Sequence, residues 1–259
     1  MGKFYKRGDA SGCILKQQAR ENSVLGVDGC RAGWVAARLS PDRAEYSLHV
    51  YRSFAGLLAA HADAACIAVD IPIGLSECFA QRRCDRQARA LLGPRRSSVF
   101  PAPDRRLLGF DEYQAANRFS RAQCGKGISQ QCFHLFRKIA EVDAIMSPAL
   151  QERIFEVHPE IAFQAASGRS HLEYPKRRVE GFEERRSILH RIFPEPSIPP
   201  RSLIVKSVAG ARTGDVQPDD ILDALIAAWT ALRHSRNEHE RLPDQCEYDP
   251  RGLRMEIIF

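Results

Sequence analysis

Alternating apolar residues predict β structure at the start of the folded chain. From Val24 a short apolar segment leads to Asp28, and a second apolar segment begins at Trp34 after two glycines. Glycine permits backbone conformations that a Cβ forbids, so this stretch is predicted to form a strand, a turn and a strand. Residues 44–51 alternate in the same way after a proline-containing turn at 40–43. The pattern therefore predicts a meander of three antiparallel strands.

A helix and a buried strand are predicted next. Ser53 is a suitable N-cap for a helix whose apolar residues recur at helical spacing as far as about residue 63. Residues 66–74 then form an almost unbroken apolar run, which is typical of a strand covered on both faces. Asp70 precedes an Ile-Pro pair that cannot continue a central strand, so its carboxylate is expected at the end of the strand.

This order of elements indicates an α/β fold of the RNase H-like type. Such a fold has a mixed sheet in which three antiparallel strands are followed by parallel strands, and its first and fourth strands are adjacent and parallel. Asp28 and Asp70 lie at the ends of these two strands. Their side chains are therefore expected to point into one cleft.

Between residues 76 and 152 the pattern changes, because only helices are predicted there. Apolar spacing and capping residues predict these helices at 84–92, 110–122 and 129–146. We interpret the segment as a helical insertion that acts as a cap or lid. It interrupts a single RNase H-like domain at residues 23–259, and the polar residues 1–22 are expected to form a flexible N-terminal extension.

The last part of the chain is predicted to supply two more strands and two helices. The strands are predicted at 153–160 and 253–259, and the helices at 181–192 and 217–232. The helix at 217–232 has the clearest apolar face, with Asp219 or Asp220 at its start. Asp223 follows Asp220 by three residues and therefore lies on the same side of the helix.

Composition changes this picture only modestly. The formal net charge is +6 and the pI is about 9.0, which suits a polyanionic partner such as nucleic acid. However, 31 of the 38 basic residues are arginine, and genome composition alone can produce such a bias. The charge is therefore weak support for a nucleic-acid partner.

The eight cysteines include no Cys-x-x-Cys pair and no cysteine–histidine group at zinc spacing. Several lie in apolar runs, where a free thiol packs as a small hydrophobic group. No stretch approaches the roughly 20 apolar residues that span a membrane. We therefore expect a reduced protein of the cytoplasm.

Acidic residues occupy the ends of several predicted elements. They are Asp28, Asp70, Glu156, Asp220 and Asp223. Clustered carboxylates repel one another, and a fold tolerates this when a cation such as Mg²⁺ or Mn²⁺ neutralises them. Two such ions about 4 Å apart can activate water and stabilise the leaving oxygen of a phosphodiester. The pattern predicts a metal site with Asp28, Asp70, and Asp220 or Asp223 as ligands.

The acidic residues also have simpler interpretations. Asp28, which precedes a glycine, and Asp70 both suit turns, and Asp219 and Asp220 suit helix N-caps. The alternative for Glu156 is a pair with an arginine of the insertion. His158 has the same strand parity as Glu156, so these two residues are candidates for catalytic proton transfer. A packed or hydrogen-bonded histidine is the commoner arrangement.

A further group of residues is assigned to substrate binding. It comprises Arg31, Arg95, Arg96, Ser97, Ser98 and Lys176. Arginine forms forked hydrogen bonds with phosphate, and residues 95–98 lie in a predicted loop that proline residues flank. The simpler interpretation of this loop is a solvated basic surface.

Five motifs, in order along the chain, carry a resemblance to a known family. They are Gly-Val-Asp-Gly-Cys-Arg-x-Gly-Trp (26–34), Val-Asp-Ile-Pro-Ile-Gly-Leu (69–75), Cys-Asp-Arg-x-Ala-Arg-x-Leu-Leu-Gly with Arg-Ser-Ser-Val-Phe-x-x-Pro (84–103), Glu-Val-His-Pro-Glu (156–160) and Asp-Asp-x-x-Asp-Ala (219–224). Together they resemble domain-of-unknown-function family 429, whose members are described as predicted nucleases with an RNase H-like fold. Ala32 stands where the family pattern has glycine, which removes no functional group.

Metal-dependent hydrolysis of DNA or RNA phosphodiesters is the leading functional prediction, and two other classes compete with it. Actin-like kinases and ATPases share the strand arrangement and an aspartate-glycine phosphate turn. Those proteins contain two such halves, each with its own phosphate motif. This chain is long enough for only one half and contains only one such motif. The third class is a non-catalytic module that binds nucleic acid or a nucleotide.

Overall fold

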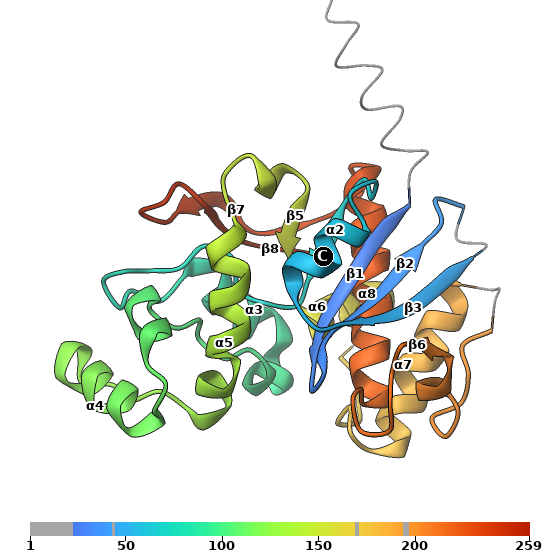
Figure 1. The fold of residues 1–259 in the computed structure, drawn as a ribbon, viewed down its shortest axis with the longest axis horizontal. Coiled ribbons are helices and arrows are strands. Elements are labelled where there is room, and N and C mark those ends of the chain that lie inside the picture. Colours follow the sequence, from blue (N-terminus) through green and yellow to red (C-terminus); the bar gives the residue numbers. More distant parts are fainter. Residues whose placement is uncertain (1–22, 43–44, 169–170, 194–196) are drawn as a thin grey trace, which may run out of the picture.

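The computed structural model describes residues 23–42, 45–168, 171–193 and 197–259 (Figure 1). The extension expected at residues 1–22 lies outside the described residues. Within the described part of the chain, a six-stranded mixed sheet is covered by helices on both faces, and a separate two-stranded sheet lies beside it.

The central sheet has the predicted arrangement of antiparallel and parallel strands. Its members are β1 Val24–Cys30, β2 Gly33–Leu39, β3 Tyr46–Tyr51, β4 Ile67–Val69, β5 Ile154–Glu156 and β6 Val208–Ala209. The strand order is β5-β4-β1-β2-β3-β6. β1–β2 and β2–β3 are antiparallel, whereas β1–β4 and β4–β5 are parallel. The predicted RNase H-like layout, with the first and fourth strands adjacent, is confirmed.

The helices follow the apolar pattern of the sequence. They are α2 Phe54–Ala60, α3 Arg83–Leu92, α4 Tyr113–Cys124, α5 Gln130–Ile145, α6 Pro159–Ala166, α7 Val179–Ile192 and α8 Pro218–Ser235. Ser53 and Ser129 cap α2 and α5, because their hydroxyl oxygens accept hydrogen bonds from backbone N–H groups of the first turn. Among the described residues, no helix is long and apolar enough to cross a membrane.

Residues 76–152 contain α3, α4, α5 and short 3-10 turns, and no strand. One of these turns, Gly93–Ser98, includes residues 95–98, which were predicted to lie in a loop. The division of the chain into a domain and an insertion, and the role of the insertion as a lid, stay predictions.

Two predicted strands are shorter in the structure. The strand predicted at 66–74 spans only β4, because the chain turns where the Ile71 N–H donates to the Val69 carbonyl (2.9 Å). The strand predicted at 153–160 ends with β5, and α6 begins at Pro159, since proline is favoured in the first turn of a helix. The helix α6 and the two-residue strand β6 were not predicted.

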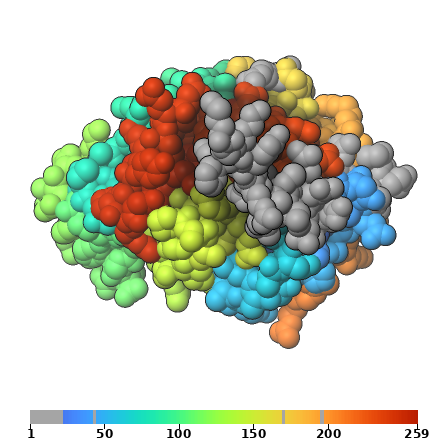
Figure 2. Space-filling view, turned by 90° about the horizontal axis from the view of Figure 1, so that it is seen from above, coloured from blue at the N-terminus to red at the C-terminus, as the bar shows by residue number. Residues whose placement is uncertain are grey.

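The strand predicted at 253–259 is β8 (Arg254–Ile258), which pairs with the unpredicted β7 (Arg241–Tyr248) in the two-stranded sheet. In Figure 2 the red surface of this hairpin adjoins the yellow-green surface near residue 150. Arg254 joins the two segments, because it donates to Glu152 Oε1 at 2.6 Å. The hairpin therefore packs on the main body of the protein.

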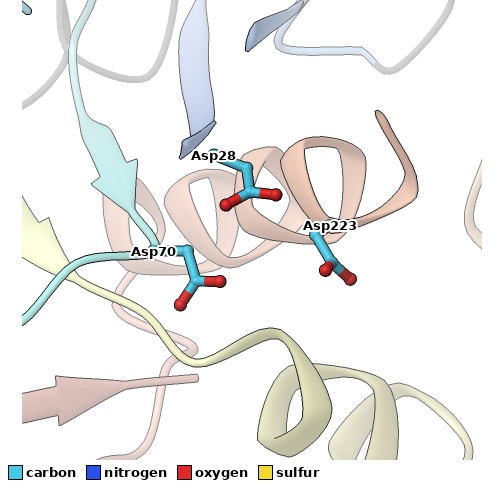
Figure 3. Close-up of side chains that lie close together, drawn as sticks. All are labelled: Asp28, Asp70 and Asp223. Carbon is cyan, nitrogen blue, oxygen red and sulfur yellow. The ribbon is translucent and has the colours of Figure 1, made fainter. Parts of the chain in front are cut away.

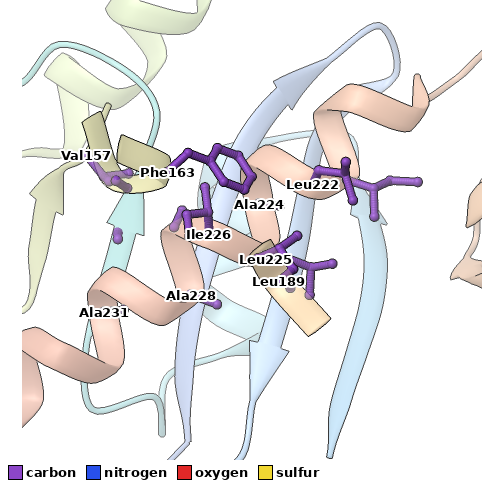
Figure 4. Close-up of a cluster of buried hydrophobic side chains, with 14 of the residues drawn as sticks. Val157, Phe163, Leu189, Leu222, Ala224, Leu225, Ile226, Ala228 and Ala231 are labelled. Carbon is purple, nitrogen blue, oxygen red and sulfur yellow. The ribbon is translucent and has the colours of Figure 1, made fainter. Parts of the chain in front are cut away.

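Two hydrophobic cores lie on opposite faces of the central sheet. α6, α7 and α8 cover one face with residues that include Phe163 and Leu225 (Figure 4). α2 and α5 cover the other face, where Phe54 packs with Leu25 and Val27 of β1. Side chains alternate along a strand, so Gly26 and Asp28 of β1 lie on the opposite face, which α8 covers.

α8 lies directly against the backbone of β1 at Gly26. A Cβ at this position would lie 2.0 Å from the backbone nitrogen of Ala228 and 2.1 Å from the carbonyl oxygen of Ala224. No side chain fits there, so glycine is required for this close approach. Asp28 is two residues further along the same face, and the contact therefore also fixes how Asp28 faces α8.

Candidate metal centre

Strand register places Asp28 beside Asp70. In the parallel pair of β1 and β4, Gly26 lies opposite Ala68 and Val27 lies opposite Val69. The next residues along the two strands are the two aspartates, and the Asp70 N–H donates to the Val27 carbonyl at 2.9 Å. By the alternation of side chains, both carboxylates lie on the face that α8 covers.

α8 brings a third carboxylate to the same place. The ligand oxygens of Asp28, Asp70 and Asp223 all lie within 4.8 Å of one another (Figure 3). Asp28 and Asp223 are buried, and Asp70 is half-buried. We refer to these three residues as the acidic triad. Asp28 also forms the turn contact expected of an Asp-Gly pair, because its Oδ1 accepts a hydrogen bond from the Gly29 N–H at 2.6 Å.

Burial and mutual repulsion oppose the ionisation of the acidic triad. Burial raises the pKa of Asp28 well above its usual range, and the charges of Asp70 and Asp223 raise it further. Burial, followed by the charge of Asp223, raises the pKa of Asp70 to about 8. A bound cation would remove this penalty, so the acidic triad has the electrostatics of a ligand set.

Lys176 supplies positive charge to the acidic triad. Its Nζ donates a hydrogen bond to Asp223 Oδ2 at 2.5 Å. The same charge acts on Asp28 and Asp70, whose pKa values it lowers against the larger effect of burial. Three carboxylates and one ammonium leave a formal charge of −2 when all are ionised. The substrate-binding role assigned to Lys176 stays a prediction.

Asp220 lies near the acidic triad but is engaged in capping α8. Its Oδ2 accepts a hydrogen bond from the Gln217 N–H at 2.9 Å, which is half of a capping box. Burial raises the pKa of Asp220 to about 6. Of the aspartates predicted at the start of this helix, Asp223 joins the cluster, whereas Asp219 and Asp220 lie in the first turn.

Glu156 is held by an arginine of the 76–152 segment. Arg82 donates two hydrogen bonds of 2.8 Å to its carboxylate oxygens, and the Ile73 N–H donates a third at 2.8 Å. Arg82 also pairs with Asp85, and all of these carboxylates are buried. Glu156 therefore pairs with an arginine of the insertion, which was the alternative interpretation of this residue. Its contacts give no support to a role in proton transfer.

His158 contacts the Gly93–Ser98 turn. Its Nε2 lies 3.4 Å from the Ser98 carbonyl oxygen, and burial lowers the pKa of the imidazole. The residue directly precedes α6, and its backbone is still extended (φ −119°, ψ 111°). Proton transfer by His158 stays a prediction.

Besides Lys176, two of the residues assigned to substrate binding have side-chain contacts within the protein, because the Ser98 hydroxyl donates to the Arg95 carbonyl at 2.8 Å and Arg95 is itself engaged. Arg95 donates to the Tyr174 carbonyl, and its Nε lies 3.8 Å from Glu160 Oε2. The exposed members are Arg31, in the β1–β2 turn, and Arg96, Ser97 and Ser98. These exposed side chains are accessible to a substrate, and their role in binding it stays a prediction.

The sequence pattern did not predict the roles of Gly26, which sets Asp28 against α8, and of Arg82, which holds Glu156. A signal existed for Gly26, since a single glycine inside a strand pattern indicates a close approach of two backbones. No local signal existed for Arg82, because its partner Glu156 lies 74 residues away in the sequence.

Comparison with known proteins adds one finding to this geometry. A search of the curated proteins found no match, and a search of the solved structures found none either. A family model described as "protein of unknown function (DUF429)" matches residues 26–247, a span that contains the acidic triad and Lys176. The match covers most of the chain and agrees with the five motifs, and the protein therefore belongs to the DUF429 family.

Proposed function

We propose that this protein is a metal-dependent nuclease that hydrolyses phosphodiester bonds in DNA or RNA. The observation that carries the proposal is the convergence of Asp28, Asp70 and Asp223 where the neighbouring strands β1 and β4 of an RNase H-like sheet end. Hydrolysis of a phosphodiester requires compensation of the charge on the phosphate and activation of water. A divalent cation at the acidic triad would meet both needs.

The donor set fits Mg²⁺ or Mn²⁺. It consists of carboxylate oxygens, which are the ligands that these ions prefer. The formal charge of the acidic triad with Lys176 is −2, which one divalent ion would balance. Asp28, Asp70 and Asp223 would hold the ion, and the pair of Asp223 with Lys176 restricts the space and charge left for a second one.

A bound Mg²⁺ or Mn²⁺ supplies Lewis-acid chemistry, because it withdraws charge from a phosphoryl oxygen and acidifies water. The chain contributes the positioning. Lys176 orients Asp223, and the exposed Arg31, three residues from Asp28, is placed to pair with a phosphate. We assign proton transfer to His158, whose lowered pKa keeps the imidazole neutral and able to accept a proton at neutral pH.

The decisive experiment measures Mn²⁺-dependent cleavage of labelled single-stranded, duplex and branched substrates. We expect cleavage by the natural protein and a loss of about 10³-fold or more in Asp28→Asn and Asp223→Asn, since several kcal/mol of charge stabilisation are removed. Asp111→Asn, at an exposed position before α4, is the matched control and should cleave normally. Cleavage that survives Asp28→Asn would contradict the assigned site.

The competing functions predict different results in the same assays. Turnover of a nucleotide without cleavage of nucleic acid would favour the actin-like phosphotransferase class. A calorimetric titration that detects no binding of Mn²⁺ would favour a non-catalytic module.

A further inference from the structure

A pocket of about 380 Å³ lies at the start of α8, the helix that carries Asp223. Its lining includes Lys206 and Arg212, the hydroxyl residues Ser202 and Thr213, and Gln217 and Pro218 at the helix start. The volume lies within the range of pockets that bind small ligands or parts of larger ones. Neither the acidic triad nor the phosphate-binding residues assigned from the sequence belong to this lining.

The charge of this pocket suits an anion. Lys206 and Arg212 contribute two positive charges, and no acidic residue belongs to its lining. Both cations are exposed, and within the described part of the chain neither side chain has a hydrogen bond or an ion pair. The larger cavity of about 620 Å³, beside the β7–β8 hairpin, has the opposite character, because its lining includes Glu77, Glu247, Asp249 and only one arginine, Arg82.

The α8 pocket lies at the same end of the sheet as the acidic triad. Pro218 lines the pocket and Asp223 is five residues further along α8, which corresponds to about 7.5 Å along the helix axis. The loop before α8 also contacts the β1–β2 turn, because the Ala32 N–H donates to the Asp215 carbonyl at 3.1 Å. The pocket and the triad are therefore joined through both α8 and the turn that carries Arg31.

We propose that the α8 pocket binds the sugar-phosphate backbone of the nucleic-acid strand whose scissile phosphate lies at the acidic triad. This inference rests on the proposed nuclease function. Because Pro218 of the pocket and Asp223 of the triad are about 7.5 Å apart along α8, the phosphates bound by Lys206 and Arg212 belong to the same strand as the cleaved bond and lie close to it. Contacts with phosphate carry no sequence information, so this pocket positions the strand without selecting its bases.

The experiment measures binding separately from cleavage. Fluorescence anisotropy in EDTA follows a labelled single-stranded 20-mer, and its duplex, as the salt concentration is varied. For the double variant Lys206→Ala/Arg212→Ala we expect the slope of log affinity against log salt to become shallower by about 1.4 for the single strand, since each lost phosphate contact contributes about 0.7. At 0.1 M salt this corresponds to binding that is roughly tenfold or more weaker.

The charge-matched control is Arg118→Ala/Lys126→Ala, in and just after α4. Both side chains are exposed, and α4 lies at the opposite side of the molecule from β6 in Figure 1. An unchanged slope in Lys206→Ala/Arg212→Ala, or an equal change in the control, would overturn the proposal. The two single variants, each expected to lose about 0.7, provide the same test if the double variant fails to fold.

Failure of the nuclease proposal gives a different pattern of results. If the natural protein binds the oligonucleotide through Lys206 and Arg212 but does not cleave it with Mn²⁺, the pocket is supported and the nuclease activity is not. If it cleaves and the variants bind normally, the pocket is excluded while the activity stands. If it binds no nucleic acid at all, both proposals are wrong.

Discussion

At the scale of single residues, Asp70 links the site to the pH dependence of stability. Its pKa of about 8 in the folded protein exceeds the value of about 3.9 in an unfolded chain. Between these two values the folded state holds a proton that the unfolded state has released. Without a cation, the free energy of unfolding should therefore fall as the pH rises from about 4 to about 8.

We expect Asp70→Asn to remove part of this dependence, because an amide does not ionise. Thermal unfolding in EDTA at pH 5 and pH 8 measures the effect. The midpoint of the natural protein should fall more between these two pH values than that of Asp70→Asn, and the variant should be the more stable protein at pH 8. Parallel pH dependences would show that Asp70 ionises without penalty.

Lys176 is the residue that compensates the acidic triad when no cation is bound. Lys176→Met leaves Asp223 without its partner, which should lower the free energy of unfolding in EDTA by about 1–3 kcal/mol. Saturating Mn²⁺ should then stabilise Lys176→Met more than the natural protein, because the ion replaces a missing charge. Melting curves with and without Mn²⁺ test this. Lys126→Met is the control, and an equal gain in both variants would exclude the compensating role.

The acidic residues illustrate how far the sequence alone predicts a site. Asp28 and Asp70 were predicted to converge, because the end of a strand and the order of strands can both be inferred from local pattern. Glu156 has the same local pattern and is instead held by Arg82. Whether such a carboxylate joins the acidic triad or forms an ion pair depends on which side chain packs against it in the fold. The pattern of hydrophobic residues contains no information on these long-range contacts.

At the scale of elements, the contact of α8 with β1 determines the geometry of the site. Gly26→Ala would place a methyl group against the backbone of Ala224 and Ala228, so α8 must shift. We expect a loss of about 1–3 kcal/mol in the free energy of unfolding and weaker binding of Mn²⁺, because Asp223 moves with the helix. Gly109→Ala is the matched control, since a Cβ there meets nothing within 4 Å.

Calorimetric titration with Mn²⁺ and a melting curve on each variant check this prediction. If Gly26→Ala binds Mn²⁺ as the natural protein does while losing stability, the contact supports the fold without positioning the ligands.

Elements were predictable where their signals are local. α2 and α5 have a serine cap and an apolar stripe. α5 was predicted to within one residue at each end, whereas α2 begins after Ser53 as predicted but ends at Ala60, about three residues early. β6 has only two residues, too few for a periodic pattern to show. The proline that begins α6 was interpreted as the end of a strand, although the same residue is compatible with a helix start.

At the scale of the whole molecule, Arg82 connects the helical segment with the sheet. Its guanidinium contacts Glu156 of β5, Asp85 of α3 and the carbonyl oxygens of Ile73 and Gly74. Arg82→Met would leave the two buried carboxylates, Glu156 and Asp85, without the cation that neutralises them. We expect a loss of about 3–5 kcal/mol in the free energy of unfolding and a melting temperature lower by roughly 6–20 °C.

Arg86→Met, at an exposed position of α3, is the control for this change, and thermal unfolding compares the two variants. The double variant Arg82→Met/Glu156→Gln should recover part of the loss, because it removes one of the unpaired charges. Similar melting temperatures for Arg82→Met and Arg86→Met would mean that the buried cluster does not connect the two parts of the molecule.

The close approach at Gly26 also bears on which ion the acidic triad would accept. Two of its members, Asp28 and Asp223, are carried by backbones in direct contact, so neighbouring side chains cannot repack to widen the space between them. A rigid group of oxygens discriminates by ionic radius. Mg²⁺ binds its oxygen ligands at 2.0–2.1 Å. Ca²⁺ needs six to eight oxygen ligands at 2.3–2.6 Å and a more flexible site. We therefore expect Mg²⁺ to be preferred over Ca²⁺, with the selectivity set by a glycine that touches neither ion.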